Sequence, residues 1–234
     1  MLFRSMCDDL RPVRQAIGDV LPLAIAAAIS PFPIIGVVLM LVTPRARSNS
    51  LMFVVGWLLG LAAVGVVGLT VASAAGASDG GESSSSADTT QIVLGAALIV
   101  FALRQWRKRP KPGDEPEMPK WMTAVDHFTP LQAAGLGVVL SAVNPKNLIL
   151  SLAAATTIAS TNLPGGDQAL AYAVYAVIAT IGVATPIVVY FTMGSRAATI
   201  LDGLKVWLAH NNAAIMAVIF LVIGAKVLGQ GIAG

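Results

Sequence analysis

Charged residues, aromatic residues and cysteine are all scarce in this chain of 234 residues. Charged residues make up 12% and aromatic residues 6%, and the single cysteine is Cys7. One cysteine excludes an internal disulfide and any relay between two cysteines. Soluble domains carry roughly 25% charged residues. Half of that fraction, together with 56% hydrophobic residues and a mean hydropathy of +0.78, indicates a polytopic membrane protein.

Several functional classes also lack their sequence signatures. No glycine loop is followed by lysine and serine or threonine, so we expect no ATPase. No nucleophile stands with a base, so we expect no enzyme and no cofactor. The predicted spans contain no Asp or Glu except Asp19 at an edge, and His127 and His210 are widely separated, so we expect no metal site. The basic residues lie in loops rather than in an aromatic-rich patch, which argues against a nucleic-acid partner.

Six apolar stretches predict membrane spans, because a span needs roughly 17–25 mostly apolar residues. They cover residues 20–42, 51–75, 90–103, 131–156, 169–193 and 213–232. The third stretch is short, and without it the chain has five spans. The predicted fold is therefore all-α, a polytopic membrane protein with about six transmembrane helices.

The distribution of lysine and arginine predicts the orientation in the membrane. Three connections hold ten of these residues, and the two connections that alternate with them hold none. The first set is 43–50, 104–130 and 194–212, and the second is 76–89 and 157–168. Cytoplasmic loops are enriched in lysine and arginine, so the first set is predicted to face the cytoplasm. We therefore expect a multi-pass protein of the plasma membrane with both termini outside.

Proline interrupts the first and the fourth predicted spans at matching places. Pro31 and Pro33 lie in the first span, and Pro145 lies in the fourth, 114 residues after Pro31. Proline removes a backbone donor and clashes with the carbonyl four residues earlier, so each helix must bend or open there. Broken backbone at membrane depth must face protein or water. Paired breaks in two halves of a chain point to the binding site of a transporter.

The repeated break predicts two related halves. An N-terminal interfacial segment covers residues 1–19, and the first three-helix repeat covers 20–103. A cytoplasmic linker covers 104–130, and the second three-helix repeat covers 131–234. Because each half has an odd number of spans, the second repeat is predicted to enter the membrane inverted.

Lys146 is the ionisable residue placed deep in the fourth predicted span. A lysine near the bilayer centre is costly, so we expect it to face the bundle interior and to be functional. It could hold an anionic headgroup as a fixed charge, or take part in proton coupling. Alternatively, it snorkels to the outer face. The amides of Asn144 and Asn147 could bond the carbonyls that Pro145 frees, or a substrate.

The break in the first span supplies further candidates. Ser30 can form a hydrogen bond beside Pro31, and the helix N-termini that open at such breaks attract anions through the helix dipole. A kink is also predicted in the fifth span, where threonine and proline adjoin. The predicted substrate-binding residues are Lys146, Asn144, Asn147, Ser30 and Phe32. The predicted helix-break and gating residues are Pro31, Pro33, Pro145, Thr185 and Pro186.

The motifs at both breaks resemble those of a known family. They are Ser30-Pro31-Phe32-Pro33 and the run Leu-Ser-Ala-Val-Asn-Pro-Lys-Asn-Leu at 140–148, and the stretch Asn211-Asn212-Ala213 matches as well. By these stretches the chain resembles the GAP family of actinobacterial envelope proteins, the peptidoglycolipid- and sulfolipid-addressing proteins, within the lysine-exporter superfamily. The resemblance covers nearly the whole chain. It implies a plasma-membrane protein of about six spans that is needed to move complex glycolipids toward the cell surface.

The residues favour one function and leave two alternatives open. The leading hypothesis is a transporter that exports an amphipathic, anionic envelope lipid or glycolipid by alternating access, with the headgroup held between the two breaks. One alternative is an exporter of a small solute such as an amino acid, although a buried lysine without a buried acid would repel a cationic solute. The other is an accessory protein that scaffolds a lipid-export complex. The expected partners are the lipid or glycolipid substrate, larger export machinery and further copies of the chain.

Overall fold

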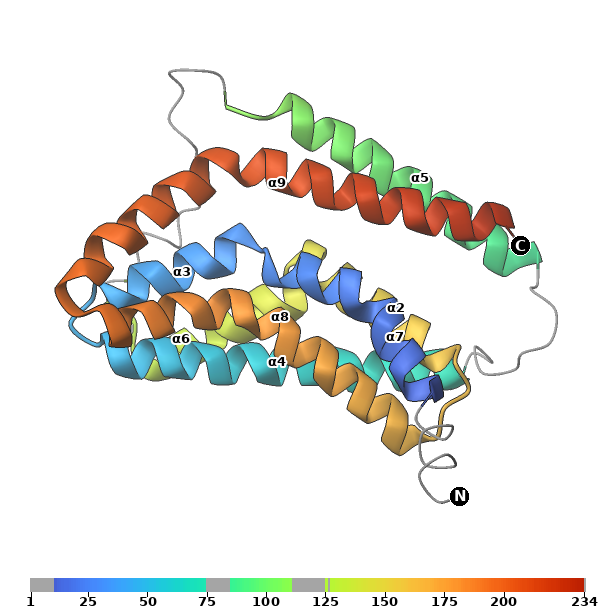
Figure 1. Ribbon diagram of the computed structural model, residues 1–234, viewed down its shortest axis with the longest axis horizontal. Coiled ribbons are helices and arrows are strands. Elements are labelled where there is room, and N and C mark those ends of the chain that lie inside the picture. The colour runs from blue at the N-terminus through green and yellow to red at the C-terminus, as the bar shows by residue number, and fades with distance from the viewer. Residues whose placement is uncertain (1–10, 75–84, 111–124, 126, 234) are drawn as a thin grey trace. The chain divides into compact units, whose positions relative to one another are not determined.

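The computed structural model describes residues 11–74, 85–110, 125 and 127–233, and every element within these ranges is helical (Figure 1). In chain order the elements are α2 (Arg11–Ala28), α3 (Pro31–Leu41), α4 (Ala46–Ala74), α5 (Ser85–Arg107), α6 (Pro130–Val138), the π-helical turn η2 (Val139–Val143), α7 (Pro145–Ala159), α8 (Gly165–Met193), the 3₁₀ turn η3 (Gly194–Arg196) and α9 (Ala197–Ala233).

These helices form two compact units. The first unit contains α2, α3, α4, α6, η2, α7, α8, η3 and the start of α9 as far as Leu201. The second unit contains α5 and α9 from Asp202 onward. Each unit takes helices from both predicted halves of the chain, and the division into two repeats stays a prediction. The predicted interfacial segment lies partly outside the described residues, and from Arg11 onward it is continuous with α2.

The first predicted break lies between α2 and α3. Ser30, which precedes Pro31, has extended backbone angles, with φ −99° and ψ 108°. The proline ring disfavours a helical conformation for the residue before it, so the helix cannot run through this position unchanged. α2 and α3 are therefore separate helices that bend by 49° at the break, as the change of direction in Figure 1 shows.

The second predicted break lies between η2 and α7. Asn144, which precedes Pro145, has φ −59° and ψ 119°. Its backbone N–H donates to the carbonyl of Val139, five residues earlier, at 2.9 Å, and this bond closes the π-helical turn. The helices on either side bend by 61°. Both breaks that the prolines predict are therefore confirmed.

Two glycines bring α4 against the second break. A Cβ atom on Gly56 would lie 1.9 Å from the carbonyl oxygen of Ala134, and one on Gly60 would lie 2.0 Å from Oγ of Ser141. Because these glycines have no side chain, α4 can approach the backbone of α6 and the side chain of Ser141 closely, as in other small-residue contacts within membranes. α4 consequently packs along α6 and η2.

Gly182 brings α8 against the first break in the same way. A Cβ atom there would lie 1.8 Å from the carbonyl oxygen of Ala28, the last residue of α2. Pro186 follows one turn later, yet α8 runs as one helix from Gly165 to Met193. α8 is therefore continuous through Thr185 and Pro186, and the kink predicted there stays a prediction.

The second unit is a pair of helices packed through small and aromatic residues. A Cβ atom on Gly95 of α5 would lie 2.5 Å from the backbone nitrogen of Leu228 on α9. The rings of Phe101 and Phe220 lie 6.4 Å apart, so the two helices also share an aromatic contact. This unit therefore has its own close helix–helix contact.

Three continuous helices of the described residues, α4, α8 and most of α9, are long and apolar enough to cross a membrane. Each of the two bent pairs adds one more if it forms a single span, which makes five. α5 contains the short third stretch, 90–103, and is not among them. Six spans and an inverted repeat are therefore not confirmed. The exposed apolar side chains on these helices fit a lipid-facing surface, which supports a membrane protein.

Candidate functional site

Lys146 connects the second break to the first. It is the second residue of α7 and is only 2% exposed. Its Nζ donates to the carbonyl oxygen of Ile29 at 3.0 Å. Ile29 lies four residues before Pro33, so its carbonyl would have lost a helical partner because proline has no backbone N–H. The ammonium therefore takes the place of the missing donor.

Asn147 lies beside Lys146 and is fully buried. Its Nδ2 donates to the carbonyl oxygen of Leu140 at 2.8 Å and reaches Oγ of Ser30 at the 3.5 Å limit of a hydrogen bond. The carbonyl of Leu140 needs this partner because the backbone N–H of Asn144, four residues later, bonds the carbonyl of Val139 instead. Asn147 thus links both breaks with one amide group. Its Oδ1 has no hydrogen-bond partner among the described residues.

Asn144 has a local role in the second break. Its Oδ1 accepts a hydrogen bond from the backbone nitrogen of Lys146 at 3.1 Å. This is an N-cap contact, which satisfies one of the unpaired donors at the start of α7. Asn144 therefore fixes the start of the helix that carries Lys146 and Asn147.

The electrostatic character of the site is positive. α3 and α7 both begin at the breaks, and the N-terminus of a helix carries a partial positive charge. The described partner of the Lys146 ammonium is a carbonyl, which has no net charge. The site can therefore attract an anionic group, whereas it repels a cation.

The other predicted site residues differ in their exposure and in their hydrogen-bond partners. Ser30 is buried between the breaks and contacts Asn147, whereas Phe32 is half-buried at the second position of α3. Thr185 is exposed, and its hydroxyl donates to the carbonyl of Ile181 in its own helix at 2.7 Å. Pro186 is buried. The roles of these residues in binding or gating stay predictions.

The sequence reasoning missed several polar groups of the first unit. Oγ of Ser151, one turn after Asn147 on α7, lies 3.1 Å from the hydroxyl of the buried Tyr175. The hydroxyl of Tyr172 donates to the carbonyl of Leu61 at 3.0 Å. The four-residue spacing of Asn147 and Ser151 could have indicated a shared polar face of α7. Tyr175, the partner of Ser151 on α8, has no comparable signal in the sequence.

No group of three or more His, Cys, Asp or Glu residues in the described part of the chain could hold a metal ion. Comparison with protein families found a match over residues 20–233 to the family described as Sap, sulfolipid-1-addressing protein. Neither the curated proteins nor the solved structures gave a match.

Proposed function

The chain belongs to the sulfolipid-1-addressing protein family, and we propose that it exports an anionic lipid or glycolipid of the cell envelope across the plasma membrane by alternating access. A sulfolipid has an acidic, sulfur-containing headgroup and apolar chains. The headgroup would bind between the two breaks, while the chains remain in the surrounding lipid. The family membership and the positive charge of the site support the same class of substrate.

The buried ammonium of Lys146, held by the carbonyl of Ile29, is the observation that carries this proposal. A group with a full negative charge attracts an ammonium more strongly than a neutral carbonyl does. A bound headgroup would therefore compete with Ile29 for Lys146. Losing that contact would release the end of α2 from the start of α7, so substrate binding and movement of the broken helices would be coupled.

The packing of the first unit supports an arrangement of two inverted repeats. α4 packs along α6, and α8 packs along α2, so the continuous helix of each half lies against the broken helix of the other half. In this arrangement α5 and α9 would be the third spans of their halves and would complete six. Both termini would then lie outside, as the distribution of lysine and arginine predicts.

The export proposal is tested with the full chain reconstituted in lipid vesicles. A fluorescent phosphatidylglycerol serves as the anionic lipid and a fluorescent phosphatidylcholine as its zwitterionic counterpart. We expect the protein to accelerate transfer of the anionic lipid between leaflets, and Lys146→Gln to slow this transfer by about tenfold or more, because a charge-assisted hydrogen bond is lost. Lys108→Gln removes an exposed lysine of the same charge and serves as the matched control. Equal transfer by the wild type and by Lys146→Gln would contradict the proposal.

The accessory role is the second candidate, and one observation favours it. Lys146 and Asn147 are already bonded to carbonyls within the chain, as residues with a purely structural role would be. Purified protein that moves no lipid, but that co-purifies with an energised export pump, would support this role. Vesicles that release an amino acid but transfer no lipid would instead support the small-solute alternative.

A further inference from the structure

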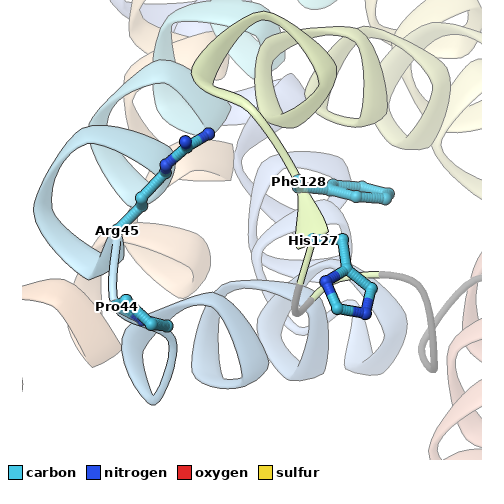
Figure 2. A pocket seen from close by; sticks show the side chains of 4 residues that line it. All are labelled: Pro44, Arg45, His127 and Phe128. Atoms are coloured by element: carbon cyan, nitrogen blue, oxygen red, sulfur yellow. The ribbon is translucent and has the colours of Figure 1, made fainter.

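A pocket lies in the first unit, away from the two breaks. Its volume is about 320 Å³, and it is lined by Pro44, Arg45, His127 and Phe128. Pro44 and Arg45 belong to the turn between α3 and α4, and His127 and Phe128 precede α6. Figure 2 shows the two pairs on opposite sides of the pocket. The distribution of lysine and arginine predicts that this end of the unit faces the cytoplasm.

The wall of the pocket that His127 and Phe128 form is held by hydrogen bonds. Nδ2 of Asn49, a residue of α4 that is 1% exposed, donates to the carbonyl of Phe128 at 2.8 Å. Thr129 caps α6 through a reciprocal pair of bonds with Gln132. The segment that carries His127 and Phe128 is therefore fixed against α4 at one residue and against α6 at the next. A wall that is already fixed needs little ordering when a ligand binds.

Arg45 supplies a cation that no described residue neutralises. Its guanidinium has neither a hydrogen bond nor an ion pair among the described residues, and the ring nitrogens of His127 are likewise unpaired there. Arg47, two residues later, has a different role, because its guanidinium carbon lies 5.6 Å from the centre of the Phe191 ring. Arginine remains charged at all physiological pH values and matches the geometry of phosphate, sulfate and carboxylate groups.

Exposed apolar residues flank the pocket in the sequence on both sides. Val42, two residues before Pro44, is 65% exposed, and Leu131, three residues after Phe128, is 78% exposed. A ligand with apolar chains could therefore place its headgroup in the pocket and its chains against these side chains. This combination suits a lipid better than a small dissolved anion.

The pocket also lies at the far end of the helix that leads to the candidate substrate site. α3 spans 11 residues from Pro31 to Leu41. At 1.5 Å per residue, the helix separates the pocket from the first break by roughly 16 Å. A headgroup that enters at the pocket would thus be one helix length from Lys146.

From these observations we infer that the pocket at Arg45 and His127 is a receiving site for the anionic headgroup of a membrane lipid, occupied before the headgroup reaches Lys146. This inference rests on the proposed export function, because it assigns the pocket to an earlier step for the same substrate class. Arg45 is the principal anion-binding residue, and Phe128 forms the apolar side of the pocket. Export then uses two positively charged binding sites, one at each end of α3.

Binding to the purified full chain tests the inference without any transport step. The probe is short-chain phosphatidylglycerol, and titration calorimetry in detergent gives its affinity. We expect Arg45→Gln to weaken binding by about tenfold, Arg45→Lys to retain part of the affinity, and Arg47→Gln to bind as the wild type does. Equal weakening by Arg45→Gln and Arg47→Gln would show attraction by overall charge only and would overturn the site.

Two comparisons identify the source of the anion and any competing carboxylate. Short-chain phosphatidylcholine and inorganic sulfate should each bind more weakly than phosphatidylglycerol. Sulfate that binds as tightly as the lipid would overturn the assignment to a lipid headgroup. Asp126 precedes His127 in the sequence and lies outside the described residues. If the pocket binds an anion, Asp126→Asn should preserve or increase the affinity, since it removes a negative charge, and a loss of affinity would contradict the inference.

Failure of this inference can be distinguished from failure of the export proposal. If Lys146→Gln abolishes lipid transfer while Arg45→Gln changes neither binding nor transfer, the receiving site is wrong and the export proposal stands. If Arg45→Gln weakens binding but the wild type transfers no lipid in vesicles, the pocket stands as a lipid-binding site and the export proposal fails. The inference is supported in full when Arg45→Gln weakens both binding and transfer while Lys146→Gln still binds the probe.

Discussion

The ammonium of Lys146 lies 3.0 Å from the carbonyl oxygen of Ile29, a residue 117 positions earlier in the chain. One side chain thereby joins the start of α7 to the open backbone that follows α2. Neither a charged ammonium nor an unpaired carbonyl is tolerated in hydrocarbon, so each group compensates for the other. The same contact that makes the breaks stable also places a positive charge between them.

Restoring the backbone donors that proline removes should make Lys146 less important for stability. In the double variant Pro31→Ala, Pro33→Ala the helix can close across Ser30, so the carbonyl of Ile29 gains a backbone partner. We expect the destabilisation caused by Lys146→Met to be smaller in this background by about 1.5–3 kcal/mol, the value of one hydrogen bond to a charged group. Thermal unfolding in detergent of all four proteins measures the difference. Equal effects of Lys146→Met in both backgrounds would show that the ammonium does not replace the missing donor.

Asn147 should matter more for stability than its neighbour Ser30. Asn147→Leu leaves the buried carbonyl of Leu140 without a partner, which costs about 1–3 kcal/mol. Ser30→Ala removes a contact at the 3.5 Å limit, so its effect should be below about 1 kcal/mol. Unfolding of the two variants in detergent, compared with the wild type, checks this order. A larger effect of Ser30→Ala would mean that the contact between the breaks, rather than the repair of the π-helical turn, is the stabilising bond.

Gly182 should not accept even a methyl group. A Cβ atom there overlaps the carbonyl of Ala28, so Gly182→Ala must push α8 away from the first break, at a cost of about 1–3 kcal/mol or more. Gly135→Ala is the matched control, because a Cβ atom on Gly135 of α6 meets nothing within 4 Å. Alanine is the better helix former by about 0.5–1 kcal/mol, so this control should be neutral or stabilising. The measurement is unfolding together with lipid transfer, and similar behaviour of the two variants would contradict the close packing.

The orientation can be measured with single cysteines in a Cys7→Ser background. Ser160 and Ser48 are both exposed, and they lie in connections that are predicted to face opposite sides of the membrane. On intact cells a membrane-impermeant maleimide should label Ser160→Cys but should label Ser48→Cys only after the membrane is opened. The opposite pattern would place the termini and the Arg45 pocket on the other side. Labelling of both positions on intact cells would exclude a fixed orientation.

The helix breaks follow from local chemistry and could therefore be predicted from the chain alone. Proline lacks an N–H in any fold, and it disfavours the helical region for the preceding residue, so Ser30 and Asn144 both have non-helical backbone angles. The position of the unpaired carbonyl at Ile29 also follows, because it lies four residues before Pro33. Long apolar runs identified α4, α8 and α9 as candidate spans for the same reason, since length and hydropathy are local properties.

The partners of these groups depend on packing between distant segments, which no local pattern encodes. Lys146 could have reached outer water, a substrate or the facing break, and its bond to Ile29 exists because α7 packs beside α2. The approach of α8 at Gly182 likewise depends on which helix covers the first break. Local backbone chemistry thus determines where the helices break. The three-dimensional packing of the helices determines which side chains bond the carbonyls that the breaks leave unpaired.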